Sequence, residues 1–547
     1  MKKTFIIYLA ILATFSSCSL KEDPTSFSEA DEYYDTLTKC QTGVNSLYTN
    51  VRAMLNGTGM FQTTECASDL MIMNLSSAQN AILDISPAKP GFASNLWQGC
   101  YTGIMKANNI IYYIDKGVET EKFGETEALE LKGEAIVLRA FFYYLLTSAF
   151  GDVPYYEERV TDENRLYITS LPRMSATASR DSLITQLQTL IFTKADGGME
   201  AFELKRSYDG NHSNRMGAAA GLIIAAKFCM WNERWEDAIK VMSYLEDIYG
   251  HYAENPSKFG LDYPLTDIPY SQKYTRESIF EISNTYEAYG MQSVGNLAAY
   301  AMPSKGTGDK YDGVYIPELG EKAVISIQMR PTTWYFQTIM PYSSSDKRSG
   351  EYSNESKEPR GGSGNLAWRW KGYDSDTTAR TADNQVVKWF NSCSNGSVRP
   401  WLGNKFWCYG MNSSSDFNNY KIFRYADVCL MLAEAHLNLG AYKEAADYLN
   451  ITRTRAGLLP AIDLMYVGGS QESLMEEIRM ERARELFGEY QRKFDLVRWG
   501  IWYERTMAFN DGKYIKGYIR PCHRYLPIPE DQVTFSGGAL HNEEYNK

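Results

Sequence analysis

Apolar residues recur with a spacing close to 3.6 over three long stretches in the first third of the chain, which predicts three helices. The stretches cover residues 31–55, 95–116 and 127–149 and contain few helix breakers. The third has a wide apolar face, and Gly151 and Pro154 follow its end. A mostly α-helical fold is therefore predicted.

Two later segments, residues 225–242 and 433–449, share a pattern of small and aromatic residues, with Ala226, Trp235 and Ala238 matching Ala433, Tyr442 and Ala445. The pattern fits a tetratricopeptide-type helical hairpin, because the small residues let two antiparallel helices approach closely. Gly440 occupies the expected turn position, whereas Glu233 replaces it in the first copy. The alternative is a chance similarity between two amphipathic helices.

Residues 251–419 lack sustained helical periodicity and read as an irregular region. Pro, Gly, Ser and Asn separate short β-prone pieces such as Ser278–Ser283 and Ala323–Gln328. Aromatic side chains in loops, with no helical or strand face to join, are candidates for exposure. The region holds six of the eleven tryptophans: Trp334, Trp368, Trp370, Trp389, Trp401 and Trp407.

The N-terminus reads as a secretory signal, because two lysines precede an apolar run over Phe5–Phe15 that is too short to span a bilayer. Ser16-Ser17-Cys18 resembles a bacterial lipobox, so Cys18 is predicted to carry the lipid anchor of a lipoprotein. Lys21-Glu22-Asp23 resembles the surface-export signal of certain Gram-negative lipoproteins. The alternatives are a buried N-terminal strand, an ordinary cysteine near a cleavage site, and a solvated acidic tether.

Composition narrows the range of partners. The formal charge is −11 over 547 residues, and no basic patch accompanies it, so no nucleic-acid partner is expected. No later apolar stretch is long enough to cross a membrane, which leaves the N-terminal lipid as the predicted membrane contact. The cysteines form no CxxC motif, and a disulfide framework is not expected. The predicted division is 1–17 signal peptide, 18–30 tether, 31–250 N-terminal helical region, 251–419 irregular region and 420–547 C-terminal helical region.

Catalytic signatures are largely missing. The five histidines are scattered, with no HExxH and no Cys/His ligand spacing, so no metal site and no cofactor are predicted. No GxSxG elbow, P-loop or dinucleotide fingerprint occurs. The 67 Asp and Glu residues leave paired carboxylates for glycoside hydrolysis open as an alternative. His436 is expected to be a packed helical residue rather than a base, and the protein is predicted not to be an enzyme.

Residues 475–500 are predicted to form one charge-rich helix. Within it, Glu489 is placed to reach Arg492 and Lys493 at i+3 and i+4, which stabilises a helix. A catalytic acid–base cluster is the functional alternative. The favoured interpretation is an ion-paired helix packed against the scaffold.

This helix resembles the C-terminal signature of the SusD/RagB family of nutrient-binding lipoproteins, and three further motifs in the expected order support the resemblance. EAIVLRAFFYYLLTSAFGDVP (134–154), FRYADVCLMLAEAHLNLG (423–440) and YLPIPEDQV (525–533) are similar to the family's other motifs. Ala483 and Tyr490 depart from the pattern, since Arg and Gly are usual there. The signature residues are Ile478, Glu481, Arg482, Glu485, Leu486, Glu489, Arg492, Asp495, Leu496, Arg498, Trp499 and Gly500.

The resemblance implies tetratricopeptide-like hairpins that support an irregular, ligand-facing region. It also implies a lipoprotein on the outer face of a Gram-negative outer membrane, placed as a lid over a SusC-like, TonB-dependent β-barrel. Such proteins capture an oligosaccharide or another nutrient and release it into the barrel without cleaving it. One alternative is a non-carbohydrate cargo such as a basic peptide, whose binding would weaken with salt. The other is a purely structural scaffold role.

Exposed indole and phenol rings are the predicted binding platforms, because they offer rigid apolar surfaces to the C–H faces of sugars. Trp368 and Trp370 alternate at strand spacing, which places both on one face of a strand and Arg369 on the other. Trp97 is included because it stands at a predicted loop-to-helix entry. The full set of candidates is Trp97, Tyr289, Trp334, Trp368, Trp370, Tyr373, Trp401 and Trp407.

Overall fold

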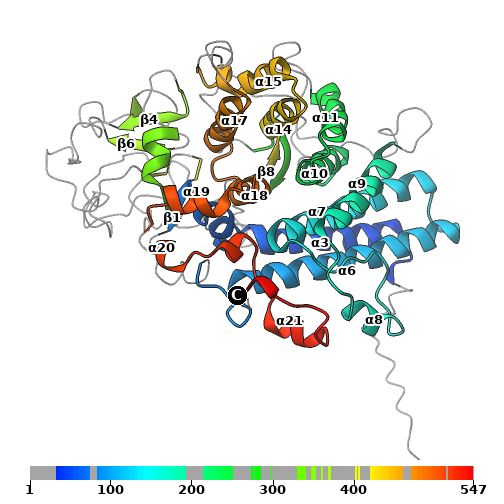
Figure 1. Cartoon of the computed structure of the whole chain (residues 1–547). Helices are drawn as coiled ribbons and strands as arrows, with labels where there is room; N and C mark the ends of the chain where they lie inside the picture. Colours follow the sequence, from blue (N-terminus) through cyan, green and yellow to red (C-terminus); the bar gives the residue numbers. More distant parts are fainter. Residues whose placement is uncertain are drawn as a thin grey trace, which may run out of the picture.

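Figure 1 shows the computed structural model of the chain, in which helices dominate. The predicted mostly α fold is confirmed. The structure describes residues 33–73, 83–192, 214–249, 273–275, 277–284, 297, 329–339, 346–352, 359–360, 367–370, 401–402, 405–406, 419–458, 460, 470–512 and 515–545.

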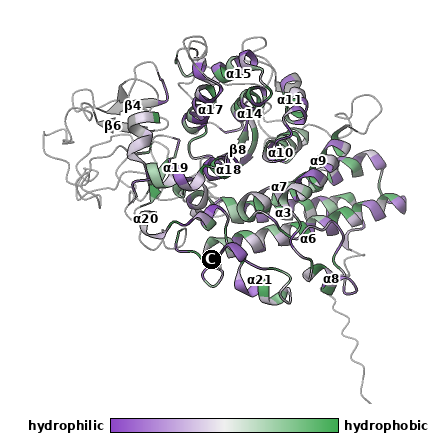
Figure 2. Cartoon of the chain, in the orientation of Figure 1, coloured by the Kyte–Doolittle hydropathy of each residue, from purple (hydrophilic) through white to green (hydrophobic). Residues whose placement is uncertain are grey.

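The three predicted N-terminal helices are present and pack side by side: α3 (Leu37–Leu55), α6 (Phe92–Glu119) and α7 (Glu125–Phe150). Helix α7 is buried along nearly all of its second half, because neighbouring elements cover it on every side. Glycine allows its close approach to α6: a Cβ on Gly103 would lie 2.4 Å from the ring of Phe142. In Figure 2, green, apolar residues run along these helices, and purple, hydrophilic residues gather at the right-hand end where α6 and α7 are joined.

Helical hairpins form the second layer. Helix α9 (Ala176–Phe192) precedes the hairpin of α10 (Ala218–Trp231) and α11 (Trp235–Tyr249). The second predicted hairpin consists of α14 (Tyr425–Asn438) and α15 (Tyr442–Arg455), and α17 (Gln471–Glu485) packs against both of its helices. Both hairpins are therefore confirmed, while their assignment as tetratricopeptide units stays a prediction.

The two hairpin turns use the same backbone conformation. Gly440 has φ 77° and Glu233 has φ 55°, both in the left-handed region. In each turn, the amide of the next residue donates to a carbonyl five positions back: Ala441 to His436 at 2.9 Å and Arg234 to Cys229 at 2.9 Å. Glu233 thus occupies a site that favours glycine.

The prediction of one helix over 475–500 is wrong. Helix α17 ends at Glu485 and α18 (Arg492–Arg498) starts a new direction, because Gly488 at φ 77° and Tyr490 at φ 63° interrupt the helical backbone. The buried carboxylate of Glu65 accepts hydrogen bonds from the amides of Gly488 at 3.1 Å and Gln491 at 3.0 Å. These bonds replace the helical ones lost at the break.

Short strands connect the scaffold to one end of the molecule. Strand β1 (Met71–Met73) pairs antiparallel with β3 (Met329–Pro331), and β2 (Ser278–Ile282) pairs antiparallel with β8 (Tyr420–Arg424). Strand β2 confirms the strand predicted at Ser278–Ser283, whereas Ala323–Gln328 lies outside the described residues. A four-stranded sheet has the order β5 (Pro359–Arg360), β4 (Ser349–Tyr352), β6 (Ala367–Trp370), β7 (Trp401–Leu402).

This sheet lies at the left end of Figure 1, beside α19 (Trp502–Phe509) and far from α8 (Arg165–Thr169). The C-terminal segment returns to the first layer, where the amide of Leu526 donates to the carbonyl of Ala149 at 2.7 Å. Two of the resemblance motifs, 134–154 and 525–533, therefore meet in space. The remaining short elements are α4 (Thr58–Phe61), η1 (Gln62–Cys66), η5 (Tyr335–Ile339), α20 (Ile515–Tyr518), η6 (Pro521–Arg524), α21 (Glu530–Phe535) and η7 (Glu543–Tyr545).

Within the described ranges, none of the helices combines the length and apolar character that crossing a lipid bilayer requires. The predicted division into segments at 250/251 and 419/420 stays a prediction.

Candidate functional site

The four-stranded sheet carries three of the predicted platform tryptophans. Trp368 and Trp370 belong to β6, as predicted, and Trp401 begins β7. The register sets Trp368 opposite Trp401 across an antiparallel pair, and Trp370 beside Tyr352 across a parallel pair. Trp368 and Trp401 are thus register partners although 33 positions separate them in the sequence.

Trp334 stands close to this sheet, since it follows β3 and β3 contacts β7. Its ring stacks on Phe509 of α19, with a centroid distance of 4.3 Å and an interplanar angle of 18°. The guanidinium of Arg505 lies 4.9 Å from the Trp334 ring centroid. Trp334 stays half-buried in this stack, which fixes the position of the indole.

Two residues of this stack, Phe509 and Arg505, are not among the predicted platforms. They stand four positions apart on α19, so helical spacing alone places them on one face. Their contact with a tryptophan about 170 positions earlier has no local sequence signal. Thr333 is held there as well, because its hydroxyl donates to Asp511 at 2.5 Å.

Trp97 is a correction. It was predicted as a binding platform, but only 3% of its surface is exposed. Its ring packs edge-to-face with Phe150 at 5.1 Å and against Tyr101 at 4.9 Å. The indole faces the core because Trp97 lies within α6, five residues after the helix begins at Phe92, and not at a loop entry. It belongs to the hydrophobic core of the first layer and offers no surface to a ligand.

The other predicted positions lie outside the described residues: Cys18, Tyr289, Tyr373 and Trp407. Their roles as lipid anchor and platforms stay predictions.

A buried network of ion pairs ties the sheet to the helical scaffold. Arg348, just before β4, donates to Glu481 at 2.8 Å and Glu485 at 2.9 Å on α17. Lys405, three residues after β7, donates to Glu489 at 2.5 Å. The start of β4 and the chain after β7 are thereby fixed to one helix and the break that follows it.

The predicted i+3 and i+4 pairs of Glu489 with Arg492 and Lys493 are wrong. Glu489 lies in the helix break, so its carboxylate points away from α18 and pairs with Lys405 and Arg424. Arg492 pairs instead with Asp69 at 2.7 Å. The broader interpretation, an ion-paired segment packed against the scaffold, is confirmed.

The network balances its own charge within the described residues. Six cations face six carboxylates through a continuous chain of contacts. Burial raises the pKa of the Glu485 carboxyl, but Arg455, Arg424 and Arg348 outweigh it and hold that pKa well below its usual range. The members are Arg348, Lys405, Arg424, Arg453, Arg455 and Arg484 with Glu277, Asp346, Glu477, Glu481, Glu485 and Glu489.

A second cluster accounts for the rest of the charged signature. Arg482 bridges Asp427 at 2.9 Å and Asp495 at 2.8 Å. Arg498 and the indole Nε1 of Trp499 both donate to Glu434, at 2.5 and 2.9 Å. These residues are buried or nearly so and face one another, so the signature has a structural function.

The described residues contain no metal centre of a familiar kind. No group of three or more His, Cys, Asp and Glu side chains among them is placed to hold a metal ion. His436 stacks on Tyr448 with a centroid distance of 5.3 Å, as expected of a packed helical residue. The described geometry is that of a buried ion-pair network that supports a tryptophan-bearing sheet.

Family models match most of the chain. A model described as "SusD family" matches residues 276–545, and one described as "Starch-binding associating with outer membrane" matches residues 20–214. These matches and the helical scaffold define a class of proteins, the SusD type that associates with the outer membrane. The chain belongs to the SusD family.

Relatives cover nearly the full length. The SusD-like protein P25 of Formosa agariphila is 24% identical over 571 aligned positions, covering 100% of this chain and 99% of the relative. Surface glycan-binding protein A from Bacteroides thetaiotaomicron, solved in complex with laminarihexaose, has a TM-score of 0.64 at 18% identity, with 92% of this chain and 99% of that chain covered. A laminarin-binding SusD-like protein has a TM-score of 0.67 at 19% identity, with 91% and 98% covered. The two structures establish the shared fold.

Proposed function

We propose that this protein is a non-catalytic glycan-binding lipoprotein that captures an oligosaccharide on the face of the β4–β7 sheet. The observation that carries the proposal is the register of Trp368 opposite Trp401 on a sheet fixed by a buried ion-pair network. Two solved proteins that share the fold, one bound to laminarihexaose and one described as laminarin-binding, support a glycan as the cargo.

The binding mechanism follows from the properties of indole rings. If two or three platforms each cover ~100 Å² of apolar sugar surface, burial contributes roughly 5–7 kcal/mol at about 25 cal/mol/Å². The entropy lost on association removes part of this, which leaves affinities of about millimolar to tens of micromolar. Weak binding suits a protein that hands its cargo on.

We further propose that a lipid on Cys18 anchors the protein at the cell surface, and that it delivers the glycan to a SusC-like, TonB-dependent β-barrel. The family model's description as associating with the outer membrane supports this location.

Affinity electrophoresis tests the function. Protein that begins at Ser19 is run through gels that contain a panel of neutral and charged polysaccharides, together with Trp368→Ala, Trp370→Ala and Tyr167→Ala. Tyr167 is the matched control, because it is a 65% exposed aromatic residue on α8, far from the sheet in Figure 1.

Retardation of the wild type and Tyr167→Ala in one gel, lost in either tryptophan variant, is the expected result. Retardation that survives both tryptophan substitutions would remove the site from the sheet. Failure to bind any polysaccharide would overturn the glycan proposal, and salt-sensitive binding of basic peptides would then replace it.

A further inference from the structure

A hollow of about 310 Å³ lies outside the tryptophan sheet, between α3, strand β2 and the segment that precedes α10. Its size falls at the lower end of the range for small-molecule sites. The lining residues that matter for its chemistry are Asn45, Arg52, Asn214, Arg215 and Glu281.

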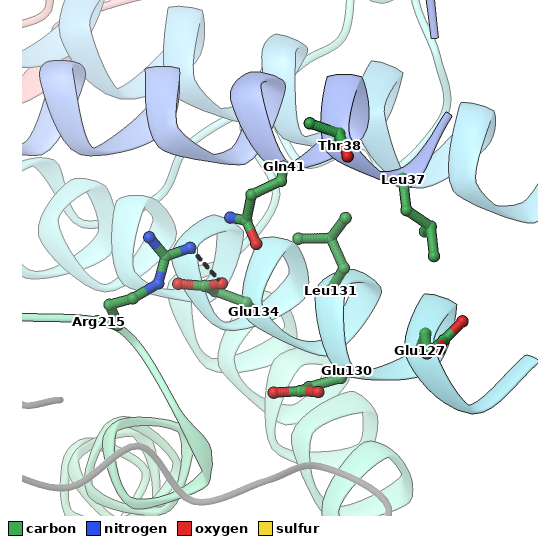
Figure 3. A pocket seen from close by; sticks show the side chains of 8 residues that line it. All are labelled: Leu37, Thr38, Gln41, Glu127, Glu130, Leu131, Glu134 and Arg215. Atoms are coloured by element: carbon green, nitrogen blue, oxygen red, sulfur yellow. Dashed lines mark hydrogen bonds and ion pairs between the residues drawn. The ribbon is translucent and has the colours of Figure 1, made fainter. Parts of the chain in front are cut away.

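Two of the lining charges are already neutralised. Arg215 pairs with the carboxylate of Glu134 at 2.7 Å, a contact drawn as a dashed line in Figure 3. Glu281 pairs with Lys421 at 2.5 Å. Neither residue therefore adds net charge to the hollow.

Arg52 is the remaining charged residue that lines this hollow. Its guanidinium donates to the carbonyl oxygen of Ser283 and, at 2.7 Å, to the side-chain oxygen of Asn284. Within the described part of the chain, no carboxylate lies at ion-pair distance from it. Burial lowers the pKa of Arg52, as expected for a cation that loses water without gaining an anion.

Asn214 supplies a second, independent feature. Its side-chain oxygen is buried and accepts no hydrogen bond from the described residues. Buried acceptors are normally satisfied, so an unpaired one beside a hollow marks the place of a donor that the described residues do not provide. A hydroxyl group is such a donor.

We infer that this hollow binds an acidic sugar residue, with its carboxylate or sulfate on Arg52 and a hydroxyl on Asn214. A guanidinium binds either anion through charge-assisted hydrogen bonds. The inference rests on the proposed glycan function and narrows its substrate class to acidic glycans.

The neighbouring hollow, of about 330 Å³, has the opposite character. Figure 3 shows that it shares Arg215 and is lined by three glutamates of α7, Glu127, Glu130 and Glu134, together with the uncharged residues Leu37, Thr38, Gln41 and Leu131. An acidic ligand would be repelled there. Arg215 therefore separates a cationic hollow from an acidic one, which directs an anionic group to the Arg52 side.

Affinity gels with three polymers test the inference: polygalacturonate for carboxylate, dextran sulfate for sulfate, and dextran as the neutral reference. The variants are Arg52→Gln and Asn45→Asp. Asn45 is exposed and accepts a bond from Arg215 at 2.9 Å, which aspartate can also accept, so this variant adds repulsion without removing a contact. Arg173→Gln is the matched control, because Arg173 also donates to backbone carbonyls, those of Asp152, His541 and Phe150.

Retardation of the wild type and Arg173→Gln by one acidic polymer, weakened about tenfold or more in Arg52→Gln and in Asn45→Asp, would support the inference. The polymer that retards identifies the anion. If both hollow variants bind like the wild type, the inference is overturned. Binding to neutral glycans alone would overturn it while leaving the glycan function intact, and binding to no polysaccharide in the full panel would overturn both.

Discussion

At the scale of single residues, two side chains occupy backbone positions that favour glycine. Glu233 at φ 55° closes the first hairpin, and Tyr490 at φ 63° lies in the break after α17. The left-handed conformation costs a residue with a Cβ about 1–2 kcal/mol. Tyr490 offsets that cost because its ring packs edge-to-face on Phe61 and its hydroxyl donates to Leu55. Glu233 lies at an open turn and has no comparable packing.

Glu233→Gly is therefore expected to raise the free energy of unfolding by about 1 kcal/mol, because the strain at this turn disappears. Tyr490→Gly should lower it by about 2 kcal/mol, since the loss of a buried ring outweighs the relief of strain. Urea unfolding followed by circular dichroism measures both. Equal shifts in the two variants would show that backbone strain does not distinguish these positions.

Lys493 is a buried lysine whose Nζ lies 4.9 Å from the centroid of the Trp502 ring. Burial lowers its pKa to about 7. In the unfolded chain the pKa of a lysine is about 10.4. Unfolding therefore takes up a proton between about pH 7 and 10, and stability falls as the pH is lowered through that window. Below pH 7 the folded state carries the full free-energy cost of burying the charged lysine.

Lys493→Met should stabilise the protein by about 3 kcal/mol at pH 7, and the gain should shrink toward pH 10 as the lysine becomes neutral in both states. Chemical denaturation at pH 6, 7.5, 9 and 10 measures this. Lys405→Met is the control, because Lys405 is also buried, with its pKa lowered to about 8, but pairs with Glu489. That variant should destabilise. A gain in stability from Lys493→Met that does not vary with pH would contradict the lowered pKa of Lys493.

At the scale of elements, α17 and the break after it organise the site. Residues on these two segments hold both the start of β4, through Arg348, and the chain after β7, through Lys405. Periodicity predicted a helix here but could not predict where it ends, since the break depends on Glu65, more than 400 positions earlier. For the same reason it assigned Glu489 to local partners. Long-range partners carry no local signal.

Glu485→Gln should lower the free energy of unfolding by about 3–5 kcal/mol, because Arg348, Arg424 and Arg455 lose a shared buried anion. The pKa of Glu485 is depressed, so its contribution is present at neutral pH and is lost as the pH falls below about 4. Wild type and variant should therefore converge in acid. The exposed pair Lys443–Asp447 provides the control, and Asp447→Asn should change stability by less than about 0.5 kcal/mol. A Glu485→Gln variant as stable as the wild type would contradict the role of the network.

At the scale of the whole molecule, much of the architecture could be predicted from the sequence. The spacing of apolar residues located α3, α6 and α7, and the paired alanines located both hairpins. The site was predictable only in part. The alternation of Trp368 and Trp370 correctly indicated a strand, but Trp97, predicted from its position at a loop-to-helix entry, lies in the core. Burial of a single tryptophan depends on which helices pack around it, and that is decided by the tertiary fold.

Isothermal titration of the glycan that retards the wild type most strongly, into the wild type and into a Trp368→Ala/Trp401→Ala double variant, tests capture by the sheet most directly. Loss of two facing platforms should weaken binding at least about thirtyfold, with the unfolding midpoint changed little. Tyr167→Ala should bind like the wild type. A double variant that folds normally and binds within twofold of the wild type would contradict glycan capture by the tryptophan sheet.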